Sequence, residues 1–340
     1  MTINIISNQI KKTKTRGPKK VLDNTIMGLE LLGISYVLNQ PMEKYDYNWI
    51  QDSHVALIQA SLISKPCVFG PNLAVFPKGL PFLRRKLHAS SIFLFPSNWP
   101  LNVWQNLGFK ECVLKTWPSG VDTVKFGVNK IINKDTILLY FKNRDHTILK
   151  NIISILKKAK LNFVLFEYGK YNETDFLKAI QRSKFGIWLG GSESQGYAIS
   201  EALSCNLPFL VLDINSMGEV YTGNGKPLFS QKNLGHFKNT PVSSVPYFNE
   251  KCGVVTHNIE EFKDQLFFIN KNYKSYEPRA YILENFALET SASKLLEFFS
   301  YIEPKKIVSK NNYYYTSYFI YYFQLIFKAN SWKRLILKFS

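Results

Sequence analysis

The stretch that decides the fold is FGIWLGGSESQGYAISEALSCNLPFLVLD, residues 185–213. Residues 185–191 form an apolar run that ends in two glycines, residues 198–205 have the period of a short helix, and residues 208–213 are apolar again. A strand that is covered by helices on both faces of its sheet is apolar along its whole length. The stretch therefore predicts a strand, a glycine-containing turn, a helix and a second, parallel strand.

The same rhythm runs through the rest of the chain in two series. In the series that contains this stretch, earlier strands are predicted at 136–141 and 163–169, with helices at 147–160 and 174–183. In the first series, strands are predicted at 3–7, 55–59, 66–70 and 91–96, with helices at 20–32 and 102–107. Alternating strands and helices are typical of parallel sheets with helices on their faces. The fold class is therefore α/β, with two doubly wound domains.

The boundaries of these domains follow from breaks in the pattern. Periodicity is lost within residues 115–130, where Pro and Gly also occur, so we predict domains at 1–118 and 119–303. Residues 304–340 are rich in Tyr, Phe, Ile and Lys and contain no acidic residue. We treat them as a separate aromatic and basic tail. A chain of 340 residues is long enough for two domains of ordinary size.

The composition limits the classes of partner and compartment. A formal net charge of +18 indicates an anionic partner, such as a phosphate-bearing molecule, an acidic membrane surface or nucleic acid. No helix-turn-helix, zinc-finger or RNA-binding signature is present, so we expect no nucleic-acid partner. The four cysteines are far apart, as in a reduced protein without a cysteine metal site. With no signal peptide and no long apolar run, we expect a cytoplasmic protein.

Two acids within residues 185–213 indicate a ligand-binding site. Glu193 lies in the predicted turn, Glu201 lies in the following helix, and Gly196 between them would allow close approach to the backbone. The start of a helix favours phosphate, and carboxylates accept hydrogen bonds from neighbouring hydroxyl groups. At the carboxyl edge of an open α/β sheet, the pair fits a phosphate-bearing polyol. The alternative is a capping acid followed by a solvated helix glutamate.

The surrounding residues resemble a known family. The motif formed by Glu193, Gly196, Glu201, Ala202 and Pro208 resembles the donor-site motif of retaining glycosyltransferases of group 1, or family 4, which have the GT-B fold. Similar segments are WPSGVDTVKF (117–126), FPSNWPLNVW (95–104), RGPKKVLDNTIMGLELLG (16–33) and YEPRAYILENFALETSASKLLEFF (276–299). The resemblance spans about residues 3–300. Departures occur at Gln195, where the family has an aromatic residue, and at Cys205 and Asn206, where it has glycine.

The resemblance implies a GT-B protein with two Rossmann-like domains facing a central cleft. It implies an enzyme that transfers a sugar from a nucleotide-diphosphate sugar to a glycan or lipid-linked acceptor, with retention and without a metal. The nucleotide sugar is a substrate, and no cofactor is expected. The product would be a cell-surface polysaccharide such as lipopolysaccharide or capsule. The alternatives are a GT-B sugar-nucleotide epimerase and a non-catalytic sugar-binding protein of the same fold.

The resemblance also assigns roles to residues. Glu201 would hold the ribose and Glu193 the donor sugar, while backbone amides near Gly196 and Tyr197 would stabilise the leaving diphosphate. The full predicted set is Glu193, Arg144 and Lys150 as catalytic residues, Glu201, Gly196, Tyr197, Gln195, Ser194, Lys142 and Gly17 as donor-binding residues, and His54 and His88 as histidines of the cleft. The sequence does not choose which of the three basic residues contact the diphosphate. No metal ligand is predicted.

Two interpretations of the tail stay open. Tyr, Trp and Lys are typical of membrane interfaces, so the tail could hold the protein at the anionic inner face of a membrane. It could instead form helices that pack back on the first domain.

Overall fold

The computed structural model describes residues 1–13, 17–76, 87–128, 134–228, 237–304, 313 and 315–321. The chain divides into two compact units: Met1–Gly120 together with Leu288–Ser340, and Val121–Ala287. We call them the first and second units. The first boundary lies two residues after the predicted one. The segment from Leu288, which the prediction assigned to the second domain up to residue 303, belongs to the first unit.

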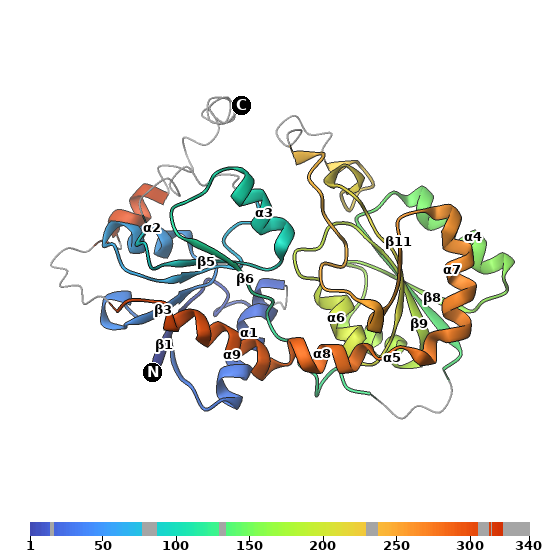
Figure 1. Ribbon diagram of the computed structural model, residues 1–340, viewed down its shortest axis with the longest axis horizontal. Coiled ribbons are helices and arrows are strands. Elements are labelled where there is room, and N and C mark those ends of the chain that lie inside the picture. The colour runs from blue at the N-terminus through green and yellow to red at the C-terminus, as the bar shows by residue number, and fades with distance from the viewer. Residues whose placement is uncertain are drawn as a thin grey trace. The chain divides into compact units, whose positions relative to one another are not determined.

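The first unit contains a parallel six-stranded sheet with the order β2-β1-β3-β4-β5-β6 (Figure 1). Its strands are β1 (Thr2–Ile6), β2 (Ser35–Leu38), β3 (Tyr47–Ile50), β4 (Val68–Phe69), β5 (Ile92–Phe95) and β6 (Val113–Thr116). The chain moves from β1 outward to β2 and then returns to place β3 on the other side of β1. Such a reversal creates a crevice at the carboxyl edge of the sheet.

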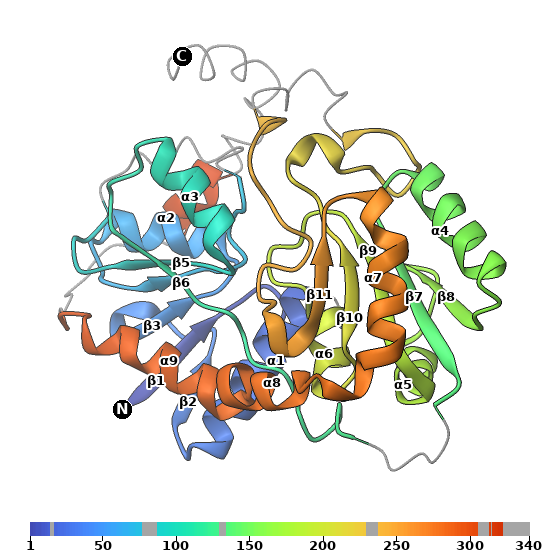
Figure 2. The same ribbon diagram turned by 45° about the vertical axis from the view of Figure 1, so that its right-hand side comes forward.

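Helices cover both faces of this sheet. They are α1 (Gly17–Leu31), α2 (His54–Leu62), α3 (Asn98–Asn106) and α9 (Leu288–Ser300). Figures 1 and 2 show α2 and α3 on one face and α1 and α9 on the other. The backbones of α1 and α9 approach closely at Gly28, where a Cβ atom would lie 2.5 Å from the carbonyl oxygen of Leu288. This packing is the reason that α9 belongs to the first unit.

The strand predicted at residues 55–59 is wrong, because these residues lie in α2. The Ser53 side chain accepts a hydrogen bond from the Ala56 amide and so caps the start of the helix. Leu57 and Ile58 are both fully buried, which makes the run continuously apolar. A short apolar run of this kind does not distinguish a buried helix from a buried strand by period.

Three strands of the first unit are absent from the sequence prediction, β2, β3 and β6. In β3 the polar Asn48 interrupts the apolar run that would have marked a strand. Asn48 is fully buried and is paired in register with Asn4 of β1, whose side-chain amide donates to its Oδ1. The Asn48 amide in turn donates to the carbonyls of Met42 and Tyr45. These bonds satisfy a polar side chain inside the sheet.

The second unit contains a parallel five-stranded sheet with the order β11-β10-β9-β7-β8. Its strands are β7 (Thr136–Lys142), β8 (Phe163–Glu167), β9 (Ser183–Gly190), β10 (Phe209–Leu212) and β11 (Gly253–Thr256). The first four confirm the strands predicted at 136–141, 163–169, 185–191 and 208–213. The order reverses between β7 and β9, so the carboxyl ends of these two strands flank the expected crevice.

The second sheet is also covered on both faces. Its helices are α4 (His146–Lys158), α5 (Glu173–Arg182), α6 (Tyr197–Ser204), α7 (Ile259–Asn272) and α8 (Pro278–Phe286). One core cluster joins α4 and α7 to the sheet, and another joins α5, α6 and α8 to its other face. Figure 2 shows α4 and α7 together. The unit is therefore doubly wound, as predicted.

Only part of the predicted tail lies among the described residues. Tyr313, Ile320 and Tyr321 pack against a core cluster of the first unit. Tyr315 and Phe319 are each 70% exposed. Residues 305–312, 314 and 322–340 lie outside the described residues. Among the helices that the structure describes, none combines the length and the apolar character needed to cross a bilayer.

Candidate functional site

The carboxyl ends of β7 and β9 bring together two predicted site residues. Lys142 ends β7, and Glu193 follows β9 by three residues. The Lys142 Nζ atom lies 2.5 Å from Glu193 Oε1 in a largely buried ion pair. The Gly191 amide also donates to the Lys142 carbonyl at 2.6 Å. The turn after β9 is thus attached to β7 by both backbone and side chain.

Helix α6 begins directly after this turn. Gly196 has a φ of +87° and precedes the first helical residue without a side-chain cap. A residue with a Cβ atom is strained at that φ, which explains the glycine. The first amides of a helix have no partner within the helix and favour an anion. Of the other predicted donor residues here, Gln195 is buried, and Ser194 and Tyr197 are half-buried.

Glu201 lies on α6 and is 4% exposed. Burial raises the pKa of the Tyr171 hydroxyl to about 12, and the charges of Glu201 and Glu193 act in the same direction. Tyr171 therefore lies in the electrostatic neighbourhood of both glutamates. The role of the two acids in binding one ligand stays a prediction.

A pocket of about 750 Å³ opens beside this region, where β8 ends and α5 begins. Gly169, Tyr171 and Asn172 contribute to its lining, together with charged residues including Lys170 and Asp175. Lys142 also contacts the turn after β8, because its Nζ lies 4.3 Å from the centroid of the Tyr168 ring. The sequence prediction did not include Tyr168 or Tyr171. The polar turn that follows the strand at 163–169 was their only signal.

The three basic candidates lie in different surroundings. Lys142 faces Glu193, whereas Arg144 is only 3% exposed and donates through Nη1 to the carbonyls of Gly190 and Leu212. Burial lowers the pKa of the Arg144 guanidinium, and neighbouring carboxylates oppose this shift. Lys150 is exposed on α4. Lys142 therefore pairs with Glu193, Arg144 joins the ends of β9 and β10, and Lys150 lies on the surface.

Asp213, which follows β10, is a further polar residue at this edge that the prediction did not include. It is 5% exposed and binds Ser243 and Ser244 of the connection to β11. The Ser243 carbonyl accepts a hydrogen bond from the Glu193 amide at 3.1 Å. The only sequence signal for Asp213 was an acid at the end of an apolar strand.

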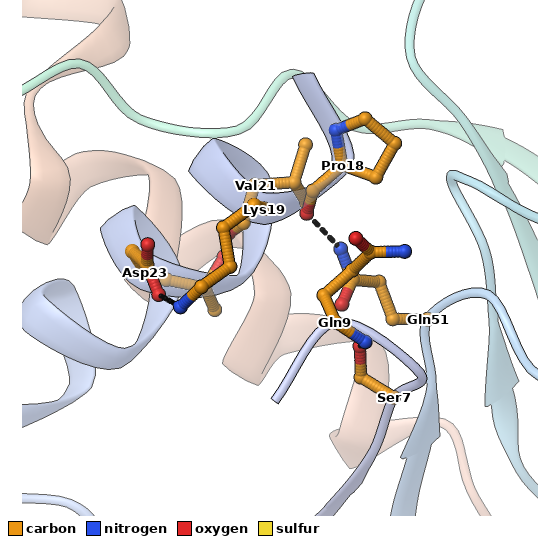
Figure 3. A network of polar contacts seen from close by, with 8 residues as sticks. Ser7, Gln9, Pro18, Lys19, Val21, Asp23 and Gln51 are labelled. Carbon is orange, nitrogen blue, oxygen red and sulfur yellow. Dashed lines mark hydrogen bonds and ion pairs between the residues drawn. The ribbon is translucent and has the colours of Figure 1, made fainter. Parts of the chain in front are cut away.

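The carboxyl edge of the first sheet carries neutral groups beside one buried acid, Asp52, whose carboxylate accepts hydrogen bonds from the Asn8 amide and from Gln9 Nε2. Gln51 follows β3, and its side-chain amide donates to the Pro18 carbonyl at 2.7 Å, at the start of α1 (Figure 3). Figure 3 also shows Ser7 and Gln9 at the end of β1. Gln51 Oε1 and Ser97 Oγ are buried and have no hydrogen-bond partner among the described residues. Both atoms can bind a hydroxyl group.

The predicted residues of the first unit have separate positions. Gly17 is exposed and begins α1. His54 contacts the Leu73 carbonyl through Nε2 and stacks on Tyr321 with ring centroids 6.0 Å apart. His88 contacts Ser90 Oγ through Nδ1 at 2.9 Å. Their roles in a cleft stay predictions. No cluster of three or more metal-binding side chains occurs among the residues that the structure describes.

Solved structures share this architecture. One is the lipopolysaccharide outer core galactosyltransferase WaaB in its apo form, with 10% identity, a TM-score of 0.51, and coverage of 88% of this chain and 99% of that chain. Another is HepE from Anabaena in complex with UDP and glucose, with 12% identity, a TM-score of 0.51 and coverage of 88% and 99%. A third is the catalytic domain of starch synthase IV from Arabidopsis thaliana bound to ADP and acarbose, with 10% identity, a TM-score of 0.51 and coverage of 88% and 98%.

At these identities the likeness shows the fold, and the predicted GT-B fold is confirmed. No protein-family profile matches the sequence, and no curated protein matches it. The assignment to group 1 or family 4 therefore stays a prediction.

Proposed function

We propose that the protein is a glycosyltransferase that moves a sugar from a nucleotide-diphosphate sugar to a glycan or lipid-linked acceptor. The observation that carries this proposal is the grouping of Lys142, Glu193, Glu201 and Tyr171 at the carboxyl edge of the second sheet. It supplies two carboxylates for hydroxyl groups and one cation for phosphate. The fold shared with WaaB, HepE and starch synthase IV supports it, and neither the epimerase nor the non-catalytic alternative is favoured by these structures.

In the proposed reaction, the donor binds to the second unit. Glu201 accepts hydrogen bonds from the ribose, and Glu193 accepts them from the donor sugar. The pocket beside Tyr171 receives the base, because an aromatic ring and polar groups at its rim fit a flat heterocycle. The main catalytic contribution is stabilisation of the charge that develops on the leaving diphosphate.

Among the three basic candidates, we assign this electrostatic role first to Lys142. Its ammonium group already lies against Glu193, whereas one guanidinium nitrogen of Arg144 is engaged by two backbone carbonyls. The amides at the start of α6 would add to the positive field. Arg144 and Lys150 become less direct contributors in this proposal. We retain the inference that the reaction proceeds with retention and without a metal.

The acceptor is proposed to bind to the first unit. Gln51 Oε1 and Ser97 Oγ, both buried, offer an acceptor and a hydroxyl to a ligand. Groups without charge suit the hydroxyls of a saccharide better than they suit a phosphate. This favours a glycan, free or lipid-linked, as the acceptor, and a role in polysaccharide synthesis such as that of lipopolysaccharide or capsule.

We also propose that the tail attaches the protein to the anionic inner face of a membrane. Tyr315 and Phe319 are exposed on the helical segment that otherwise packs on the first unit. The seven basic and no acidic residues of 304–340 favour an anionic surface. In a flotation assay with anionic liposomes, the full chain should float, and a chain that ends at Glu303 should not. Equal flotation of both would contradict the attachment.

The proposed activity is tested by a donor screen. The protein is incubated with UDP-, ADP-, GDP- and dTDP-sugars, with and without glycan and lipid extracts, and the released nucleoside diphosphate is measured. We expect release from one donor that depends on an acceptor. Chelation with EDTA should leave the rate unchanged. Conversion of the nucleotide sugar to an isomer, without release of diphosphate, would favour the epimerase instead.

A further inference from the structure

Asp213 is the centre of a buried hydrogen-bond network that the proposed reaction does not use directly. Its Oδ1 accepts from the amide and the hydroxyl of Ser244, both at 2.7 Å. Its Oδ2 accepts from Ser243 Oγ at 2.6 Å, and the Ile214 amide donates to Oδ1 at 2.8 Å. A buried carboxylate is stable only when its oxygens are bound in this way. Asp213 thus fixes residues 243–244 against the end of β10.

Residues 240–245, which we call the strap, are held along their length. The Met217 amide donates to the Thr240 carbonyl at 3.0 Å, and Ser216 and Pro241 form an antiparallel bridge. Beyond this bridge, Asp213 binds the strap at residues 243 and 244. The strap is therefore an ordered element of the second unit rather than a loose connection.

The strap lies directly on the turn that carries Glu193. A Cβ atom at Gly190 would lie 2.3 Å from Trp188 Nε1 and 2.9 Å from the Cβ of Ser244, so the strap passes close to the backbone at this glycine. The Ser243 carbonyl accepts the Glu193 amide at 3.1 Å. On the other side, Lys142 binds the Glu193 carboxylate. Glu193 is thus held between the end of β7 and the strap.

We propose that Asp213, Ser243 and Ser244 are positioning residues that set the place of Glu193 for the donor sugar. This inference rests on the proposed function for its catalytic consequence. None of the three residues needs to touch the substrate, because they act through the backbone of the turn. A displacement of about 1 Å in a reacting geometry can lower a rate about 100-fold. A network that fixes the turn therefore has a direct effect on turnover.

The first experiment measures, without any ligand, how firmly Asp213 and the strap hold the turn that carries Glu193. We call this arrangement the clamp. Hydrogen exchange is followed by mass spectrometry in the wild type, Asp213→Asn, Ser243→Ala and the control Ser183→Ala. Ser183 is fully buried and donates to the Ala179 carbonyl, but it lies at the opposite end of β9. Asp213→Asn and Ser243→Ala should each speed exchange in residues 191–197 about tenfold, and the control should not. Unchanged exchange in both variants overturns the clamp.

The second experiment measures the effect of the clamp on ligand binding and turnover. In Ser243→Ala, the Kd of the nucleotide sugar should rise about tenfold and its turnover should fall about tenfold. The Kd of the nucleoside diphosphate alone should stay within about twofold of the wild-type value. Ser243→Thr keeps the hydroxyl and should restore both. A merely structural role would weaken the two ligands equally, and that result overturns the positioning of Glu193. A wild type that binds no nucleotide sugar overturns the proposed function, while the exchange experiment still judges the clamp.

Discussion

The carboxyl edges of the two sheets differ in chemistry although the sheets share a topology. In the first unit, the buried Asp52 carboxylate is already bound by Asn8 and Gln9, and the groups left to bind a ligand are neutral, as in Gln51 and Ser97. In the second unit, the edge is charged and Lys142 is paired with Glu193. Neutral groups distinguish hydroxyl patterns, whereas charged groups stabilise a leaving anion. The difference matches the two substrates of the proposed reaction. Substitutions at either edge test it.

The largest effect is expected when the cation of the second edge is removed. Lys142→Met should lower kcat/KM for the nucleotide sugar about 100-fold, because a single donor to a developing anion is worth that much. The matched control is Lys157→Met, which removes an exposed lysine of α4 that the proposed reaction does not use and should change kcat/KM less than about twofold. Steady-state release of nucleoside diphosphate measures both. Comparable losses in the two variants would show that the ion pair does not define the site.

A smaller effect, on stability, is expected at Arg144. Arg144→Met leaves the carbonyls of Gly190 and Leu212 without their donor, so the free energy of unfolding should fall by about 2 kcal/mol. Urea unfolding of the two methionine variants measures this. Lys142→Met leaves the buried Glu193 carboxylate without its cation and should lose stability too, so kcat/KM separates the two variants, and Arg144→Met should keep more of it. If Arg144→Met is as stable as the wild type, its buried guanidinium does not join the strand ends as described.

Much of the second unit could be predicted because its local signals agree with its tertiary structure. The strands that form its centre are continuously apolar, and Gly196 and the two glutamates stand at fixed distances from β9. What the sequence could not separate was Lys142 from Arg144. Two basic residues that are two positions apart near a strand end look alike until burial and partners are known.

The first unit was less predictable, for physical reasons that particular residues show. Asn48 interrupts β3, and its burial depends in part on Asn4, a partner 44 positions earlier. Residues 55–59 could form a buried strand or a buried helix, and the Ser53 cap decides for the helix. In the second unit, Asp213 and the strap were missed for the same reason, which is that the partners are distant in sequence. Ser243 and Ser244 lie 30 and 31 positions away from Asp213.

An intermediate effect on affinity is expected at the second edge from Glu201→Gln. A hydrogen bond to a charged group is worth more than a neutral one, so the Kd of the nucleotide sugar should rise about tenfold. The fold should persist, because glutamine has nearly the same shape. Isothermal titration measures the Kd, and a melting curve checks the fold. Equal affinity of variant and wild type for the true donor would remove the ribose contact from the site.

The smallest effect tests the neutral edge. Ser97→Ala should raise the KM of the acceptor about fivefold, the value of one neutral hydrogen bond, and leave the donor Kd unchanged. Stability should change by less than about 0.5 kcal/mol, because Ser97 Oγ has no partner among the described residues. The control is Ser91→Ala, which removes a buried hydroxyl that accepts from the Cys67 amide before β5 and should lower stability without changing KM. A rise in donor Kd with Ser97→Ala would mean that the first edge also serves the nucleotide, and the division between a neutral and a charged edge would not hold.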